Sequence, residues 1–141
     1  MRRFAIAAAM FIAVPASGAG AAQTAAGAAS GPFLLFFDWG KPDITGDAAA
    51  VLDQAAQAYR QSPGAQLQIT GHTDRSGSES YNVMASRRRA EAVRAELAKR
   101  GVPVGAMTIA AYGEERPIVP TEDGVREVQN RRVEIAFVTG R

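Results

Sequence analysis

Two segments with helical periodicity, each flanked by short strand-like segments, constrain the fold of this chain most strongly. The first follows Thr45, whose side chain suits an N-cap, and it continues until residues 62–64 end the pattern. The second spans residues 80–100 and is closed by Gly101, with Pro103 shortly after. Its apolar stripe consists of Val83, Ser86, Ala90, Val93 and Leu97. The spacing predicts two amphipathic helices, each with one face packed.

Four strand-like segments complete the pattern. Residues 33–37 form a continuous apolar and aromatic run, which predicts a buried strand. Residues 66–72 and 132–137 alternate, so each predicts a strand with one buried face, and residues 107–112 predict the remaining strand. The order strand, helix, strand, helix, strand, loop, strand predicts an α+β domain. We expect a mixed four-stranded sheet with two main helices packed on one face.

Residues 1–22 have the three parts of a secretory signal peptide. Arg2 and Arg3 provide the basic start, residues 4–14 the apolar run, and residues 19–22 the small side chains that suit a signal peptidase. The apolar run is about half as long as the roughly twenty residues that a helix needs to cross a bilayer. We therefore expect cleavage, and no transmembrane anchor afterwards.

The rest of the chain divides into a leader and one domain. Residues 23–31 are rich in Ala and Gly and have too little apolar area to offset chain entropy, which predicts a flexible leader. Residues 32–141 are expected to fold as a single domain, because the roughly 115 to 120 residues that remain after removal of the signal are enough for one hydrophobic core.

Composition excludes several classes of partner and chemistry. The chain has no cysteine, which removes disulfides, thiolate metal sites, thiol catalysis and the lipid-attachment residue of a lipoprotein signal. The whole chain carries 16 basic and 14 acidic residues, so loss of Arg2 and Arg3 with the signal leaves 14 of each. A mature protein close to neutrality does not favour nucleic acid, and we expect no nucleic-acid partner.

The sequence does not indicate an enzyme or a cofactor protein. His72 is the only histidine, which argues against a metal site. Residues 72–76 contain the side-chain types of a hydrolytic triad, but neighbours in a strand point to opposite faces and no nucleophile-elbow pattern occurs. Gly71 and Gly77 match neither a phosphate loop nor a dinucleotide-binding motif. We expect no catalytic residues, no metal and no cofactor.

The densest polar cluster lies between Gly71 and Arg89. Asp74 follows the end of a predicted strand, where a loop side chain can face a cleft. On a helical wheel Arg89 lies in line with Asn82 at the edge of the apolar stripe, which predicts a half-buried guanidinium, whereas Arg88 projects into solvent. A carboxylate and a guanidinium at one cleft suit a zwitterionic ligand of amino-acid type. A salt bridge between Asp74 and Arg89 themselves is the alternative.

Several separated motifs occur in a fixed order along residues 32–138. They are FDWGK (37–41), GHTDRSGSESYN (71–82), Ser86, Arg89, Ala90 and Val93 in the helix that follows, GVP (101–103), YGE (112–114), Pro117 and NRRVEI (130–135). Together they resemble the OmpA-like peptidoglycan-binding domain of outer membrane protein A, peptidoglycan-associated lipoprotein and the flagellar stator protein MotB. The resemblance implies that family's βαβαβ-β domain.

The resemblance also implies a ligand and six site residues. In that family the Asp of the TDxxG motif and the Arg of the next helix clamp diaminopimelate in the peptide stem of peptidoglycan. The matching positions here are Asp74 and Arg89. The other residues that the resemblance assigns to the ligand site are Thr73, Gly77, Asn82 and Arg131. The free end of diaminopimelate is an ammonium beside a carboxylate, which agrees with the ligand type inferred from the residues.

Two positions differ from the family pattern, and one charged run has an alternative interpretation. Ala85 stands where the family usually has Leu, and Trp39 stands where Phe or Tyr is common. The charged run at residues 130–132 could instead be a device that protects an edge strand from unwanted pairing.

The expected function is noncovalent binding of peptidoglycan through diaminopimelate, by an exported protein that is associated with the wall in the periplasm or lies peripheral to the outer membrane. One alternative is a periplasmic adaptor that docks on an envelope protein complex through residues 33–37 and the loop at 113–129, with wall binding secondary. A wall hydrolase is the other alternative.

Overall fold

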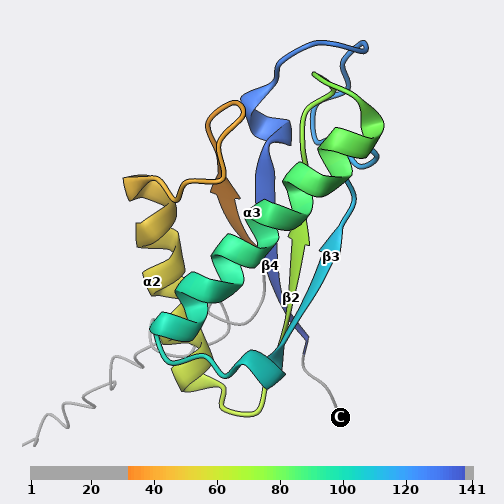
Figure 1. The fold of residues 1–141 in the computed structure, drawn as a ribbon. Helices are drawn as coiled ribbons and strands as arrows, with labels where there is room; N and C mark the ends of the chain where they lie inside the picture. Colours follow the sequence, from red (N-terminus) through yellow and green to blue (C-terminus); the bar gives the residue numbers. More distant parts are fainter. Residues whose placement is uncertain (1–31, 139–141) are drawn as a thin grey trace, which may run out of the picture.

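The computed structural model describes residues 32–138 (Figure 1). The predicted signal peptide and leader lie outside the described residues. The described elements are β1 (Phe33–Phe36), α2 (Gly46–Gln61), β2 (Gln66–Gly71), α3 (Glu79–Lys99), the short 3-10 helix η1 (Val104–Ala106), β3 (Met107–Ala111), a second 3-10 helix η2 (Val128–Asn130) and β4 (Arg132–Val138). The predicted order of strands and main helices is confirmed.

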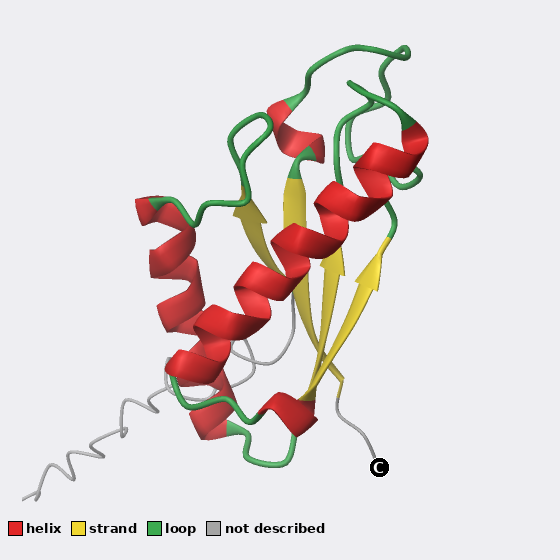
Figure 2. Cartoon of the chain, viewed as in Figure 1, coloured by secondary structure: helices red, strands yellow, loops and turns green. Residues whose placement is uncertain are grey.

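The four strands form one mixed sheet in the order β1-β4-β2-β3. β2 pairs with β3 in parallel, whereas β4 runs antiparallel to both β1 and β2. Figure 2 shows α2 and α3 on the same side of the sheet. The predicted α+β architecture is therefore confirmed, and the last strand of the chain lies in the middle of the sheet.

Side-chain caps set where the two main helices begin. Thr45 Oγ1 accepts a hydrogen bond from the backbone N–H of Ala48 at 3.1 Å, as its N-cap position predicts. Ser78 Oγ accepts from the backbone N–H of Tyr81 at 3.2 Å and caps α3 in the same way. The N-terminal turns of α3 lie beyond the carboxyl ends of β2 and β3 (Figure 1).

The hydrophobic core fills the space between the sheet and the two helices. It includes Leu35, Phe37, Leu52, Ala55, Leu67, Ile69, Val93, Leu97, Val133 and Ile135. Val83 was expected on the buried stripe of α3, but 40% of its surface is exposed. Val83 lies in the first turns of α3, and its side chain faces the loop after β3 rather than the sheet, since a Cβ on Gly113 would lie 3.1 Å from Val83 Cγ2.

The strand at the start of the domain is only half buried. Leu35 and Phe37 are each 1% exposed, whereas Phe36 is 39% exposed. β1 is an edge strand, and the two helices cover only one face of the sheet, so side chains on the other face of β1 are more exposed. The prediction of a strand is confirmed, but the expectation that this run is buried throughout is wrong.

A glycine at the end of β2 brings α3 close to the sheet. A Cβ on Gly71 would lie 2.0 Å from the carbonyl oxygen of Ser86 in α3, so no larger residue fits without moving the helix. On the same turn, Ser86 Oγ accepts a hydrogen bond from the backbone N–H of Gly113 at 3.1 Å. These contacts fix the loop after β2 against the first half of α3, where the candidate site lies.

Candidate functional site

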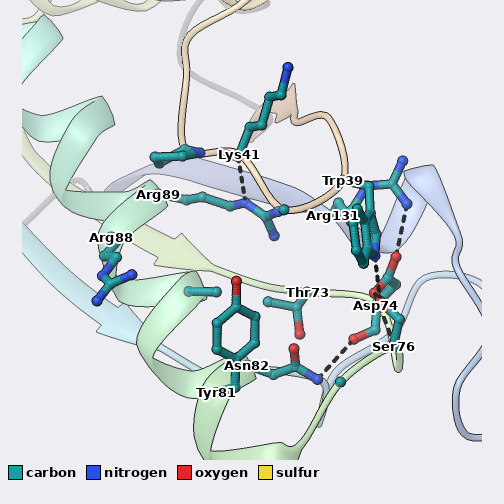
Figure 3. Close-up of a pocket in the computed structure, with 14 residues that line it drawn as sticks. Trp39, Lys41, Thr73, Asp74, Ser76, Tyr81, Asn82, Arg88, Arg89 and Arg131 are labelled. Carbon is teal, nitrogen blue, oxygen red and sulfur yellow. Dashed lines mark hydrogen bonds and ion pairs between the residues drawn. The ribbon is translucent and has the colours of Figure 1, made fainter.

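A pocket of about 260 Å³ lies between the loop after β1, the loop after β2 and α3 (Figure 3). Its volume is near the lower end of small-molecule sites, which are about 300–1,000 Å³. All six residues predicted for the ligand site line it: Thr73, Asp74, Gly77, Asn82, Arg89 and Arg131. The other lining residues are Trp39, Gly40, Lys41, Pro42, Ser76, Tyr81, Ala85 and Arg88. The structure thus brings the predicted residues together, and their role in ligand binding stays a prediction.

Asp74 is buried, with 2% of its surface exposed, and each carboxylate oxygen accepts two hydrogen bonds. Oδ1 accepts from the backbone N–H of Ser76 at 3.1 Å and from its hydroxyl at 2.5 Å. Oδ2 accepts from the backbone N–H of Glu127 at 3.1 Å and from Arg131 Nη1 at 2.8 Å. Burial alone would raise the pKa of Asp74, but the hydrogen bonds from Ser76 and Arg131 outweigh it and lower the pKa.

Arg131 is the ionic partner of Asp74. Its Nε also donates to the backbone carbonyl of Phe37 at 3.0 Å, so one guanidinium connects the loop after β2 with the end of β1.

The suggestion that residues 130–132 protect an edge strand is wrong, because β4 lies between β1 and β2. Asn130 is fully buried and its Oδ1 accepts from the backbone N–H groups of Ile118 and Val119, both at 2.9 Å, which holds the loop before β4 in place.

Arg89 is more deeply buried than predicted, with 4% of its surface exposed. Its Nε and Nη2 make long hydrogen bonds of 3.4 Å to the backbone carbonyls of Lys41 and Asp38, and its guanidinium lies 5.5 Å from the centre of the Phe37 ring. Burial lowers its pKa, repulsion by Arg131 lowers it further, and attraction by Asp74 opposes both effects. None of the ion pairs among residues 32–138 includes Arg89.

The alternative prediction, a direct salt bridge between Asp74 and Arg89, is therefore wrong. Asp74 pairs with Arg131, and among residues 32–138 the guanidinium of Arg89 makes hydrogen bonds only to backbone carbonyls and lies near the Phe37 ring. A buried guanidinium without a carboxylate partner is costly, and a carboxylate from a ligand would offset that cost. The site can accept an anionic group at Arg89 without first breaking an ion pair.

The remaining predicted residues shape the wall of the pocket. Thr73 is buried, and its Oγ1 has no hydrogen-bond partner in the described structure. Gly77 has a φ of +88°, a conformation that L side chains rarely adopt, which lets the loop turn toward α3. Asn82 Nδ2 lies 3.3 Å from the backbone carbonyl of Asp74 and 3.3 Å from Glu114 Oε1, so it joins the loop after β2 to the loop after β3.

Comparison with protein-family models gives one match that covers most of the domain. The model described as the OmpA family matches residues 36–131. The chain belongs to the OmpA family.

Curated relatives agree with this assignment. An outer membrane protein of Gluconacetobacter diazotrophicus is 45% identical over 109 residues, which are 73% of this chain but 29% of that protein. A peptidoglycan-associated lipoprotein of Haemophilus influenzae is 36% identical over 127 residues, which are 86% of this chain and 83% of that protein. The OmpA-family chain thus spans less than a third of the first relative and most of the second.

Solved structures show the same fold. The crystal structure of the peptidoglycan-associated lipoprotein from Burkholderia pseudomallei is 31% identical, with a TM-score of 0.69 over 74% of this chain and 89% of that one. The C-terminal domain of Helicobacter pylori MotB is 25% identical, with a TM-score of 0.67 over 77% of this chain and 84% of that one.

Sequence reasoning missed the contribution of the loop after β1 to the site of this OmpA-family domain. Trp39 Nε1 donates to Ser76 Oγ at 3.0 Å, and the Ser76 hydroxyl in turn donates to Asp74. The guanidinium of Arg126 lies 3.5 Å from the centre of the Trp39 ring. In the sequence Trp39 was noted as part of a family motif and as a difference from the usual Phe or Tyr, although an aromatic residue with a donor after a strand could have suggested a loop contact.

A buried histidine lies next to the site, at the ends of β2 and β4. His72 is 2% exposed, its Nε2 lies 3.0 Å from Glu134 Oε2, and its ring stacks on Tyr112 with centroids 5.6 Å apart. Burial and the charge of Arg132 lower the pKa of His72 from 6.5 to about 4, against the opposing effect of Glu134. His72 is thus neutral in the folded domain at neutral pH.

We expect the stability of the domain to fall on mild acidification because of His72. The unfolded chain takes up a proton near pH 6.5, whereas the folded one resists until about pH 4. The free energy of unfolding should therefore fall by about 1.5 kcal/mol between pH 6.5 and 5. Urea unfolding at the two pH values measures this, with His72→Gln as the control that should lose most of the dependence. An equal fall in the free energy of unfolding in the wild type and in His72→Gln would show that His72 is not the group responsible.

Proposed function

We propose that this OmpA-family domain binds peptidoglycan noncovalently in the cell envelope, through the diaminopimelate of the stem peptide. The observation that carries the proposal is the buried Arg89, which lacks a carboxylate partner among the described residues and lies in one pocket with Asp74. Relatives of the chain are named peptidoglycan-associated lipoprotein, which supports the same class of ligand.

In this proposal Arg89 and Asp74 divide the two charges of the ligand. The planar guanidinium of Arg89 takes the carboxylate at the free end of diaminopimelate with two parallel hydrogen bonds. The adjacent ammonium binds Asp74, and the Ser76 hydroxyl rotates away from Oδ1 to make room for it. Thr73 Oγ1, buried and without a partner in the described structure, is a further hydrogen-bonding group for the ligand. Charged hydrogen bonds of this kind contribute about 1.5–3 kcal/mol each.

The proposal places the domain in the periplasm after export. Residues 1–22 would direct export, residues 23–31 would form the leader, and residues 32–141 the wall-binding domain, peripheral to the outer membrane or attached only to the wall. Among residues 32–138, no helix combines the length and the apolar composition that crossing a membrane requires. A small polar site of this kind binds with micromolar or weaker affinity, so many stem peptides together would retain the protein on the wall.

Competition on purified sacculi tests the ligand. We expect the purified chain to sediment with diaminopimelate-containing sacculi. Millimolar L-alanyl-γ-D-glutamyl-meso-diaminopimelate should release it, because this tripeptide presents both charges of the free end. The matched control is the tripeptide with L-lysine in place of diaminopimelate, which keeps the ammonium but lacks the neighbouring carboxylate. Equal release by both peptides would count against diaminopimelate as the ligand, and failure to sediment would count against wall binding.

The adaptor alternative stays a prediction with less support. Within the run that was expected to form its surface, Leu35 and Phe37 are in the core and Phe36 alone is well exposed. The hydrolase alternative is tested in the same experiment, since release of soluble muropeptides from the sacculi would support it.

A further inference from the structure

The pocket carries more positive charge than the free end of diaminopimelate can match. Four cationic side chains line it, Lys41, Arg88, Arg89 and Arg131, against the one carboxylate of Asp74. Because Arg131 already pairs with Asp74, three positive charges have no acidic partner in the lining. A zwitterionic group adds one charge of each sign and leaves this excess unchanged. The charge of the pocket therefore suits a ligand with an additional anionic group.

The excess charge has a specific place on α3. Tyr81, Ala85 and Arg88 follow one another at a spacing of four and three residues, so they share one face of the helix, and all three line the pocket. Figure 3 shows Tyr81 and Arg88 on the α3 side, at the end of the pocket away from Asp74. Lys41 extends away from them in the same view. Arg88 is thus the cation best placed for a second anionic group.

Side-chain size at position 85 leaves this end of the pocket open. Ala85 has only a methyl group between the Tyr81 ring, which is 51% exposed, and Arg88, which is also exposed. Arg88 takes part in no ion pair among residues 32–138, so its guanidinium can bind a ligand without losing a partner. The Tyr81 ring and the Arg88 guanidinium therefore flank a position that has only a methyl group, and all three residues line the pocket.

We propose that Tyr81, Ala85 and Arg88 form a second subsite, which binds a further carboxylate of the same stem peptide beside the diaminopimelate. The inference rests on the proposed function and adds the class of stem that the site prefers. In a stem peptide diaminopimelate is joined to the γ-carboxyl of D-glutamate, whose α-carboxylate is free one residue away. Arg88 binds this carboxylate, and the Tyr81 ring and Ala85 contact the intervening chain. The site therefore selects stems with a free glutamate carboxylate over amidated stems.

Three soluble probes separate this subsite from the diaminopimelate clamp: free meso-diaminopimelate, the acid tripeptide L-alanyl-γ-D-glutamyl-meso-diaminopimelate, and the same tripeptide with the glutamate α-carboxylate converted to an amide. Calorimetric or NMR titration of the purified chain should show the acid tripeptide binding about 5–10-fold more tightly than the amide, a difference expected for one exposed charge-assisted contact. In Arg88→Gln the ratio of the affinities for the acid and the amide tripeptide should fall to about 1. In Ala85→Leu the larger side chain should fill the subsite and reduce the ratio in the same way.

Arg87→Gln is the matched control. Arg87 is the exposed neighbour of Arg88 and does not line the pocket, so the variant makes the same change of net charge outside the subsite. It should keep the preference for the acid tripeptide. Equal affinity of the wild-type chain for acid and amide would overturn the subsite and leave the proposed function intact, provided that free diaminopimelate binds. A loss of preference in Arg87→Gln as large as in Arg88→Gln would also overturn the subsite. The preference for the acid tripeptide would then come from the overall positive charge of this part of α3 rather than from a contact with Arg88. Failure of diaminopimelate itself to bind would overturn the proposed function.

Discussion

Replacement of Arg89 by Met should weaken binding to sacculi and to the diaminopimelate tripeptide by about 100-fold or more. The variant removes a bidentate, charge-assisted contact worth about 3 kcal/mol, and every 1.4 kcal/mol is a factor of ten in affinity. Arg89 has no ionic partner in the described structure, so ligand binding is the only interaction in which we expect its charge to be matched. Sedimentation with sacculi and titration with the tripeptide measure the loss.

The same variant should not destabilise the fold, which separates a binding residue from a structural one. Arg89 is 4% exposed, and within residues 32–138 it makes only two hydrogen bonds, each of 3.4 Å. Replacement of a buried, uncompensated charge by an apolar side chain of similar length is neutral or stabilising by about 1 kcal/mol. Urea unfolding should therefore show an unchanged or higher midpoint. A loss of more than about 2 kcal/mol would indicate that Arg89 mainly supports the loop after β1.

Arg89→Lys is the control for geometry. It keeps the positive charge but replaces the planar fork by a single ammonium, which cannot make two parallel hydrogen bonds to one carboxylate. Affinity should lie between the wild type and Arg89→Met, about tenfold below the wild type. Full affinity in Arg89→Lys would show that charge alone is sufficient.

Local patterns in the sequence predict the elements because each element is determined largely by residues close together in the chain. Thr45 caps α2 through a hydrogen bond to a residue three positions later. The alternation of residues 66–72 places Leu67 and Ile69 in the core, where both are fully buried. The same reasoning failed for Val83, because its side chain faces Gly113 in the loop after β3, and the local pattern of α3 does not encode where that loop lies.

The partners within the site could not be predicted in the same way. The pair Asp74–Arg131 joins residues 57 positions apart, and it requires β4 to lie between β1 and β2. Nothing in the spacing of Asp74 and Arg89 indicates that a different arginine, Arg131, forms the ion pair with the Asp74 carboxylate. The sequence indicated which residues gather at the pocket, whereas the sheet order determined which of them pair.

Replacement of Asp74 by Ala should remove both sacculus binding and a large part of the stability of the domain. The variant deletes the acceptor of four hydrogen bonds, and it leaves the guanidinium of Arg131, with 12% of its side chain exposed, without its ionic partner. Removal of one member of a buried ion pair costs about 3–5 kcal/mol. Because the pKa of Asp74 is lowered, the wild-type contribution should be present above pH 3.8 and be lost only as the pH falls through the lowered value.

A second substitution distinguishes the two roles of Asp74. In the double variant Asp74→Ala, Arg131→Met the unpaired charge is gone, so about half or more of the lost stability should return. Binding should not return, because no carboxylate remains for the ammonium of the ligand. Urea unfolding and sacculus sedimentation of the two variants and of Arg131→Met alone measure both quantities. Recovery of binding in the double variant would show that Asp74 acts only by neutralising the charge of Arg131. Recovery of stability without binding, together with retained binding in Arg131→Met alone, would support direct contact between Asp74 and the ligand.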